Sequence, residues 1–113
     1  MPFSNGIKGA GGEDRAAMFL SQAGYRIVGR NVRLPGGEID LVCKDRDTIV
    51  FVEVKARWSR AYGSALSAVD ARKRRTLRRL AADYVQFVAP NAPYRFDVVA
   101  MDGGRIVLHR NAF

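Results

Sequence analysis

The sequence predicts an α/β domain in which helices flank one mixed β-sheet, with the elements in the order α-β-β-β-α-β-β. Two observations carry this prediction. Apolar, β-branched runs at residues 39–43 and 49–54 flank a short polar turn, as in a β-hairpin. A long amphipathic helical pattern then separates the second run from another apolar run at residues 94–101. Strands joined through a helix are normally parallel, so the sheet combines antiparallel and parallel pairs.

The composition is that of a single soluble globular domain. The 113 residues are 48% hydrophobic and 27% charged, and a chain of this size buries roughly two-thirds of its unfolded surface. The single cysteine, Cys43, excludes an internal disulfide and a cysteine-based zinc cluster. No long apolar run opens the chain. We therefore expect a cytoplasmic protein without a signal peptide or a membrane span.

The net charge of +8 predicts a polyanionic partner. The excess lies in the second half of the chain: residues 1–55 hold 8 basic and 7 acidic side chains, whereas residues 56–113 hold 11 and 4. The most basic helix also carries a core-facing apolar stripe that folding requires, which favours nucleic acid over an anionic membrane surface. We therefore expect a nucleic acid as partner, DNA in preference to RNA, and no membrane.

The first elements are a tail and a helix. Residues 1–11 lack periodicity and contain three glycines, which predicts a flexible tail before a single domain at residues 12–113. The first helix is expected at residues 12–23 and ends at Gly24 in the left-handed C′ position. Glu13 lies in its first turn, where an acid suits the helix dipole. It also shares the face of the apolar residues three, four and seven positions later, which would direct it toward the sheet.

The first strand is expected at residues 25–34, with Asn31 and Arg33 near its end. Two interpretations of these side chains remain open: contacts to phosphate, or polar residues at a strand edge. The Pro-Gly-Gly turn at residues 35–37 then leads the chain into the central hairpin. Its glycines would let a backbone or a phosphate approach closely.

The register of the central hairpin brings charged residues together. If it closes around Arg46 and Asp47, Asp40 stands opposite Glu53, and Lys55 shares the face of Glu53. Like charges across a ladder, with Cβ atoms about 5 Å apart, are destabilising unless something positive compensates them. A divalent cation bound by hard carboxylate oxygens would do so. The alternative is a solvated strand face with a weak ion pair between Lys55 and Glu53.

These residues resemble a known group of enzymes. An acid followed on the adjacent strand by Glu-x-Lys is the signature of PD-(D/E)xK nucleases, matched by Asp40, Glu53 and Lys55. Together with GED before the first helix, N-x-R, GGEIDLV and FVEVKAR, it resembles the YraN-type family of small bacterial proteins. The likeness runs from about Gly12 to Leu108, and the proline of the signature is replaced by isoleucine. It implies a restriction-endonuclease-like core similar to that of archaeal Holliday-junction resolvases.

The resemblance also implies an activity. The protein would be a metal-dependent endonuclease that hydrolyses phosphodiester bonds in DNA, including branched recombination and repair intermediates. Its catalytic residues would be Asp40, Glu53, Lys55 and Glu13. Mg²⁺, or Mn²⁺ as a substitute, would be held by Asp40, Glu53 and the Val54 carbonyl, with Glu13 helping directly or through water. Lys55 would orient the attacking water and offset charge on the phosphorane. Resolvases of this fold act as dimers, which implies a homodimer, but no stretch of the sequence identifies a dimer surface.

A loop after the hairpin interleaves cations with aromatic residues, as nucleic-acid surfaces do. Arg57 and Arg60 are candidate contacts to nucleic acid, and Arg57 stands two residues beyond the site lysine. The lone tryptophan, Trp58, is expected to anchor its loop to the core instead.

The second helix is expected from Ala65 or Ser67 to Val88, with Ser67 and Asp70 as a capping box. Six basic residues occupy eight positions, 72–79, without an intervening acid. Such runs are usually solvated faces, but this density favours a surface for nucleic acid. Besides the two loop arginines, the candidate contacts are Arg33, Arg72, Lys73, Arg75 and Arg79. Lys73 lies on the inward apolar row, where it would either snorkel outward or reach a phosphate at the site.

The sheet is completed by a strand at residues 94–101, parallel to residues 49–55, and by an edge strand at residues 105–109. His109, the only histidine, is assigned no catalytic role. Two other functions remain open. One is a nucleic-acid-binding protein on a nuclease fold whose catalysis is weak, lost or dependent on a partner. The other is an adaptor whose basic helix binds an acidic protein.

Overall fold

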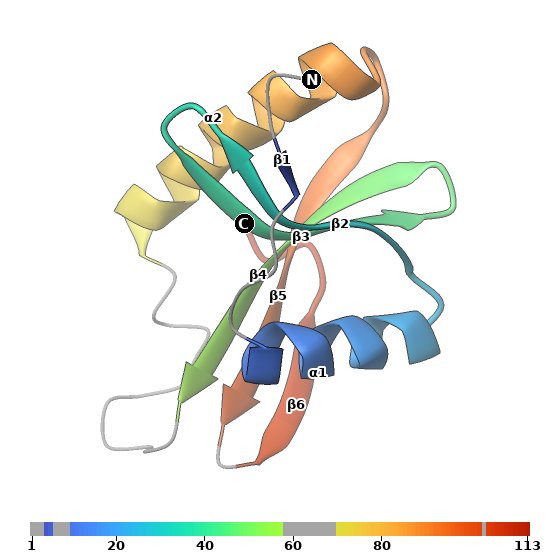
Figure 1. Cartoon of the computed structure of the whole chain (residues 1–113), viewed down its shortest axis with the longest axis vertical. Helices are drawn as coiled ribbons and strands as arrows, with labels where there is room; N and C mark the ends of the chain where they lie inside the picture. The colour runs from blue at the N-terminus through green and yellow to red at the C-terminus, as the bar shows by residue number, and fades with distance from the viewer. Residues whose placement is uncertain (1–3, 6–9, 58–69, 103) are drawn as a thin grey trace.

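The computed structural model describes residues 4–5, 10–57, 70–102 and 104–113. These residues form an α/β fold with two helices, α1 (Ala10–Gln22) and α2 (Ala71–Val88), and one mixed sheet (Figure 1). The sheet consists of a two-residue strand and five longer ones, ordered in space as in the chain. The strands are β1 (Ser4–Asn5), β2 (Arg26–Leu34), β3 (Gly37–Asp45), β4 (Thr48–Arg57), β5 (Tyr94–Asp102) and β6 (Arg105–His109). Neither helix is long and apolar enough to cross a membrane.

The strand pairing confirms the predicted mixed sheet. β4 and β5 are parallel, and the other neighbouring strands are antiparallel. The predicted hairpin register is confirmed as well, because Leu41 faces Val52 and Asp45 faces Thr48 across the β3–β4 turn. The predicted edge strand is β6, which pairs with β5. The sheet therefore presents the central hairpin in the register that sets its two acids side by side.

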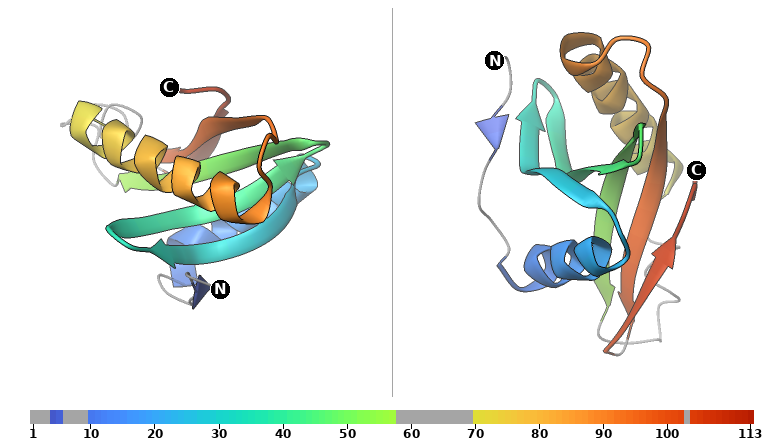
Figure 2. Two further views of the ribbon diagram at one scale, coloured as in Figure 1. Left: turned by 90° about the horizontal axis from the view of Figure 1, so that it is seen from above. Right: turned by 90° about the vertical axis from the view of Figure 1, so that its right-hand side faces the viewer.

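The two helices cover opposite faces of the sheet (Figure 2). Leu77 and Leu80 of α2 share one buried cluster with Phe51 of β4. Leu20 of α1 shares the other cluster with the next strand residue, Val52. Successive strand residues point to opposite faces, so the nearly continuous apolar run of β4 supplies both cores. Burial on both faces explains why the hairpin sequence does not alternate between apolar and polar residues.

The ends of α1 are set by local chemistry. Gly24 has φ +99, and the N–H of Tyr25 donates to the carbonyl of Leu20 at 3.0 Å. This 6→1 hydrogen bond is that of a Schellman motif, and it confirms the predicted helix end with Gly24 at C′. At the other end α1 begins at Ala10, and Ser4–Asn5 pairs with β2. Part of the predicted N-terminal tail therefore belongs to the sheet and to the helix.

The second helix begins later than predicted. Asp70 is its N-cap, with extended backbone angles of φ −77 and ψ 177, and its side chain accepts a 2.9 Å hydrogen bond from the N–H of Lys73. A cap residue has a non-helical backbone, so the expected start at Ala65 or Ser67 is wrong. Ser67 itself lies outside the described residues, and so do Trp58 and Arg60.

Candidate active site

Asp40 and Glu53 come together where the central hairpin ends. The β3–β4 ladder closes with Leu41 opposite Val52, and the next step in this register brings Asp40 to Glu53. Beyond this point a side chain replaces the ladder bond, because Asp40 Oδ2 accepts from the N–H of Val54 at 2.9 Å. The Asp40 carboxyl group is close enough to Glu53 to raise the pKa of that residue. The pair that the sequence predicts is therefore formed, and the backbone of β4 orients its first member.

Glu53 is held in a polar but incomplete environment. Its side chain is 2% exposed, and Oε1 is buried without a hydrogen-bond partner among the described residues. Burial raises the pKa of Glu53 to about 8, and the neighbouring Asp40 carboxyl group acts in the same direction. Buried carboxylate oxygens normally have partners, since an unpaired one loses its hydration without compensation. The site therefore favours either a proton or a bound cation.

Two ammonium groups approach the other oxygen of the same carboxylate. Glu53 Oε2 lies 3.7 Å from Lys55 Nζ and 3.5 Å from Lys73 Nζ. Both distances suit ion pairs but exceed the usual hydrogen-bond length of about 3 Å. Lys55 comes from β4, whereas Lys73 comes from the first turn of α2. Of the two interpretations of Lys73, the structure supports the one in which it turns toward the site.

Asn31 stands across β3 from this site. On either side of it Arg30 pairs with Leu41 and Val32 pairs with Ile39, so the register places Asn31 opposite Asp40. Its side chain is buried, and its backbone has φ +49, a left-handed conformation that asparagine tolerates better than most residues. Asn31 is therefore neither a solvated edge residue nor an exposed phosphate contact. It belongs to the polar interior behind the acid pair.

Glu13 does not complete a three-acid site. It lies half-buried on α1, the helix that covers the sheet face opposite α2. Among the described residues, no group of three His, Cys, Asp or Glu side chains could hold a metal ion. Asp40 and Glu53 alone remain as carboxylate ligands. Mg²⁺ commonly uses one or two protein carboxylates and keeps several waters, so these donors and the unpaired Glu53 oxygen fit that ion.

The predicted contacts to nucleic acid differ in their surroundings. Arg72 and Arg75 are exposed on α2. Arg33 is exposed on β2, and its Nε lies 3.7 Å from Glu38 Oε2. Arg57 ends β4, but its side chain is not among the described ones, and the loop arginine beyond it lies outside the described residues altogether. The basic face of α2 therefore begins in the same helical turn that supplies Lys73.

Arg79 has a contact of its own within the fold. Its guanidinium donates to the carbonyls of Pro35 and Gly36, both at 3.4 Å. A Cβ at Gly36 would lie 2.6 Å from Arg79 Nη2, and one at Gly37 would lie 2.9 Å from a methyl of Leu80. The glycines of this turn are thus approached by side chains of α2. The sequence predicts close approach by a backbone or a phosphate, whereas the groups that lie close to these glycines are side chains of α2.

Sequence reasoning missed a second polar cluster, centred on Asp97. This side chain is fully buried, and it accepts hydrogen bonds from Tyr25 Oη at 2.6 Å, Arg95 Nε at 3.0 Å and the N–H of Asn111 at 2.9 Å. Arg95 also donates to Asp45 at 3.0 Å. The sequence carries one signal for this cluster: Arg95 and Asp97 stand two positions apart, and so on one face, in a strand that is mostly apolar.

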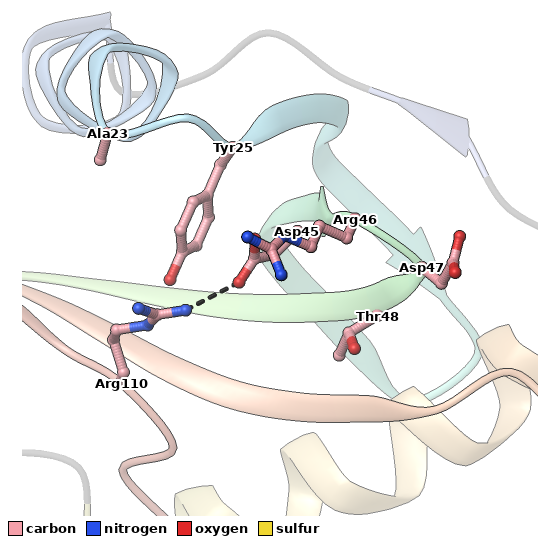
Figure 3. A pocket seen from close by; sticks show the side chains of 7 residues that line it. All are labelled: Ala23, Tyr25, Asp45, Arg46, Asp47, Thr48 and Arg110. Carbon is pink, nitrogen blue, oxygen red and sulfur yellow. Dashed lines mark hydrogen bonds and ion pairs between the residues drawn. The ribbon is translucent and has the colours of Figure 1, made fainter.

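The cluster borders a polar pocket of about 580 Å³ at the β3–β4 turn. Figure 3 shows Tyr25, Asp45 and Arg110 lining this pocket, where Asp45 accepts a 2.7 Å hydrogen bond from Arg110. Arg46, Asp47 and other residues of the turn complete the lining. Charged groups of both signs face one another here, so the pocket has no unpaired acid comparable to Glu53.

Comparison with known proteins places the chain in a family. Residues 12–101 match the model of the Uncharacterised protein family UPF0102. A UPF0102 protein of Burkholderia thailandensis is 49% identical over 111 residues, which cover 97% of this chain and 77% of the relative. UPF0102 proteins of Methylibium petroleiphilum and Symbiobacterium thermophilum are 46% and 48% identical, with 93% of this chain and 92% and 94% of the relatives covered. The chain therefore belongs to the UPF0102 family.

Proposed function

We propose that the protein is a metal-dependent endonuclease that hydrolyses phosphodiester bonds in DNA, built on a restriction-endonuclease-like core. The observation that carries this proposal is the incomplete pairing of Glu53. It lies beside a second acid, Asp40, one of its oxygens has no hydrogen-bond partner among the described residues, and two lysines stand near the other. A purely structural acid would have its oxygens saturated, whereas a cation site keeps an oxygen available.

The donor atoms suit a hard divalent cation. Asp40 and Glu53, with the Val54 carbonyl, would hold Mg²⁺ or Mn²⁺, which when bound polarises a phosphate oxygen and lowers the pKa of a water molecule. Asp40 is oriented for this role by the N–H of Val54. Lys55, which is 33% exposed, orients the attacking water and stabilises the negative charge that grows on the phosphorane. Glu13 acts at most through water.

The charge distribution supports DNA as the substrate. The net charge of +8 favours a polyanion, and Arg72 and Arg75 are exposed beside the turn that carries Lys73. A DNA duplex bound along α2 would therefore bring a phosphate to Asp40 and Glu53. Branched DNA is part of this proposal through the likeness to junction resolvases, and a homodimer would supply the two sites that symmetric cuts need.

A second candidate function rests on a specific observation. The described residues contain no third acidic, histidine or cysteine ligand near the pair. A nucleic-acid-binding protein that obtains the missing ligand from a partner protein would have the same site. It would bind DNA alone but cut it only in a complex.

Cleavage of labelled linear, flap and four-way-junction DNA tests both candidates. The wild type should cut at least one of them in Mg²⁺ or Mn²⁺ and none in EDTA. Asp40→Asn and Glu53→Gln should cut at least about 100-fold more slowly, because each removes a carboxylate ligand of the proposed metal ion, which would stabilise the transition state. Both variants should retain DNA binding, measured by fluorescence anisotropy.

The outcomes separate the candidates. Equal cleavage by the wild type and both variants would reveal a contaminating nuclease and contradict the proposal. Binding without cleavage by pure wild-type protein, on all three substrates and with either metal, would favour the second candidate.

A further inference from the structure

Two lysine ammonium groups from different elements approach Glu53, which lies beside Asp40. Lys55 Nζ and Lys73 Nζ lie 3.7 Å and 3.5 Å from the same oxygen, Oε2, while Oε1 has no hydrogen-bond partner among the described residues. Neither lysine is close enough for a normal hydrogen bond. The ammonium groups therefore lie at ion-pair distance from Glu53 without saturating its oxygens by hydrogen bonds.

A divalent cation at this carboxylate would repel both ammonium groups. At separations of about 4 Å such repulsion is substantial even in a polar environment, so a lysine leaves when a metal ion arrives. Lys55 and Lys73 have the freedom to leave, since their side chains are 33% and 39% exposed and end in a compact charge on a flexible stem. Outside the site, the strongest acceptor for a released ammonium would be a phosphate of bound DNA.

Lys73 is better placed for this exchange than Lys55, because its helix also carries the basic surface. The backbone of its turn is fixed by the Asp70 cap and, one turn on, by buried Leu77. Only the side chain has to move. Arg72 and Arg75 are exposed in the same turn, so a phosphate held there is within reach of the released ammonium.

We propose that Lys73 exchanges partners, binding Glu53 before the metal ion is present and a DNA phosphate afterwards. This inference rests on the proposed endonuclease function and names how that site is regulated. A metal ion that enters without DNA leaves the Lys73 ammonium without a counter-charge, and DNA that binds without metal competes with Glu53 for it. When both are bound, each negative group has its own cation. Metal and DNA therefore raise each other's affinity, as thermodynamic linkage requires.

Lys73→Met tests the exchange in two binding measurements. Without DNA, this variant should bind Mn²⁺ about three- to tenfold more tightly than the wild type, because a repelling charge is gone; electron paramagnetic resonance of free Mn²⁺ gives the affinity. With labelled duplex DNA, Ca²⁺ should strengthen binding by the wild type but strengthen it much less in Lys73→Met, measured by anisotropy on DNA shown to be uncut.

Two matched variants control for charge and for simple loss of a DNA contact. Lys73→Arg keeps a cation and should bind Mn²⁺ nearly as the wild type does. Arg75→Met removes an exposed cation from the same helical turn, so it should weaken DNA binding by the same factor with and without Ca²⁺ and leave Mn²⁺ affinity unchanged. Thermal melting followed by circular dichroism checks that each variant is folded.

The result that overturns the exchange is a folded Lys73→Met variant with unchanged or weaker Mn²⁺ binding. The endonuclease proposal would survive that result, provided that Asp40→Asn removes Mn²⁺ binding. Absence of Mn²⁺ binding by the wild type would instead contradict the metal site itself, and the exchange with it.

Discussion

Among the described residues, the two buried carboxylates, Glu53 and Asp97, have very different surroundings. Asp97 Oδ1 accepts from Arg95 and from the N–H of Asn111, and its Oδ2 accepts from the hydroxyl of Tyr25. Glu53 has one oxygen without a partner and shares the other between two lysines at ion-pair distances. The same cost of burying a charge is offset almost completely in one place and only partly in the other.

The difference is the one expected between a structural acid, Asp97, and a ligand of the proposed metal site, Glu53. Asp97 connects β5 to the residue before β2, since its partner Tyr25 is 72 positions away in the chain, so its hydrogen bonds hold distant segments together. Glu53 stabilises little by comparison, because its partners leave an oxygen unused. A fold retains such an unfavourable group where function needs it. Asp97→Asn should therefore mainly lower stability, whereas Glu53→Gln should mainly lower the proposed activity.

Asp97→Asn should show the largest effect on stability. The amide cannot accept all three hydrogen bonds in place of the carboxylate, and Arg95, only 18% exposed, would lose its closest counter-charge. We expect the free energy of unfolding to fall by about 3–5 kcal/mol, the usual cost of breaking a buried pair. Urea denaturation measures it. A loss below about 1 kcal/mol would remove the distinction between the two acids.

Glu53→Gln should have a smaller effect, and one that depends on pH. Because burial and Asp40 raise the pKa of Glu53 to about 8, the folded state prefers the protonated acid. Protonated Glu53 therefore contributes its full share to the stability of the wild type below the unfolded pKa of about 4.3. That contribution is lost as the pH rises through about 8.

Urea denaturation in EDTA at about pH 5 and pH 9 measures that dependence. Relative to Glu53→Gln, the wild type should be less stable at the higher pH by on the order of 1–3 kcal/mol. A difference between the two proteins that does not change with pH would show that Glu53 is as well compensated as Asp97.

Asp70→Ala should have the smallest effect on stability. Of the two carboxylate sites, it should affect only that of Glu53. Removing the cap of α2 leaves the N–H of Lys73 without its acceptor, which typically costs about 1 kcal/mol. The first turn would fray, so the metal-dependent gain in DNA affinity should shrink as well. Urea denaturation and anisotropy measure the two quantities. Asp70→Ser, which keeps a capping oxygen, should restore both.

The sequence predicted the Glu53 region far better than the Asp97 region. A two-residue turn fixes the pairing of its strands, so the register around Arg46 and Asp47 already determined that Asp40 meets Glu53. Gly24 likewise predicted the end of α1, because the C′ position of a helix requires a residue that tolerates positive φ. Local chemistry sufficed in both cases.

The remainder depended on contacts that the sequence does not encode locally. Asp97 finds its hydroxyl partner across the whole fold, and nothing near it in the chain identifies Tyr25. Asn31 is buried within β2 and has a positive φ, which a period-two pattern cannot anticipate. For Lys73, helical spacing predicted the inward face of the helix but could not identify Glu53 as its neighbour. A side chain that snorkels outward and one that turns toward the site therefore both remained open. The helix start was misplaced because Ser67 and Asp70 are both good caps.

The agreement between strand order and chain order has a consequence for how the molecule folds. Neighbours in sequence pair first, since short loops close with the least loss of entropy. The β3–β4 ribbon, closed by a short turn, can therefore bring Asp40 and Glu53 together before α2 and its lysine pack on the sheet. At such a stage the two acids face each other with Lys55, two residues after Glu53, as the cation nearest to them in the chain.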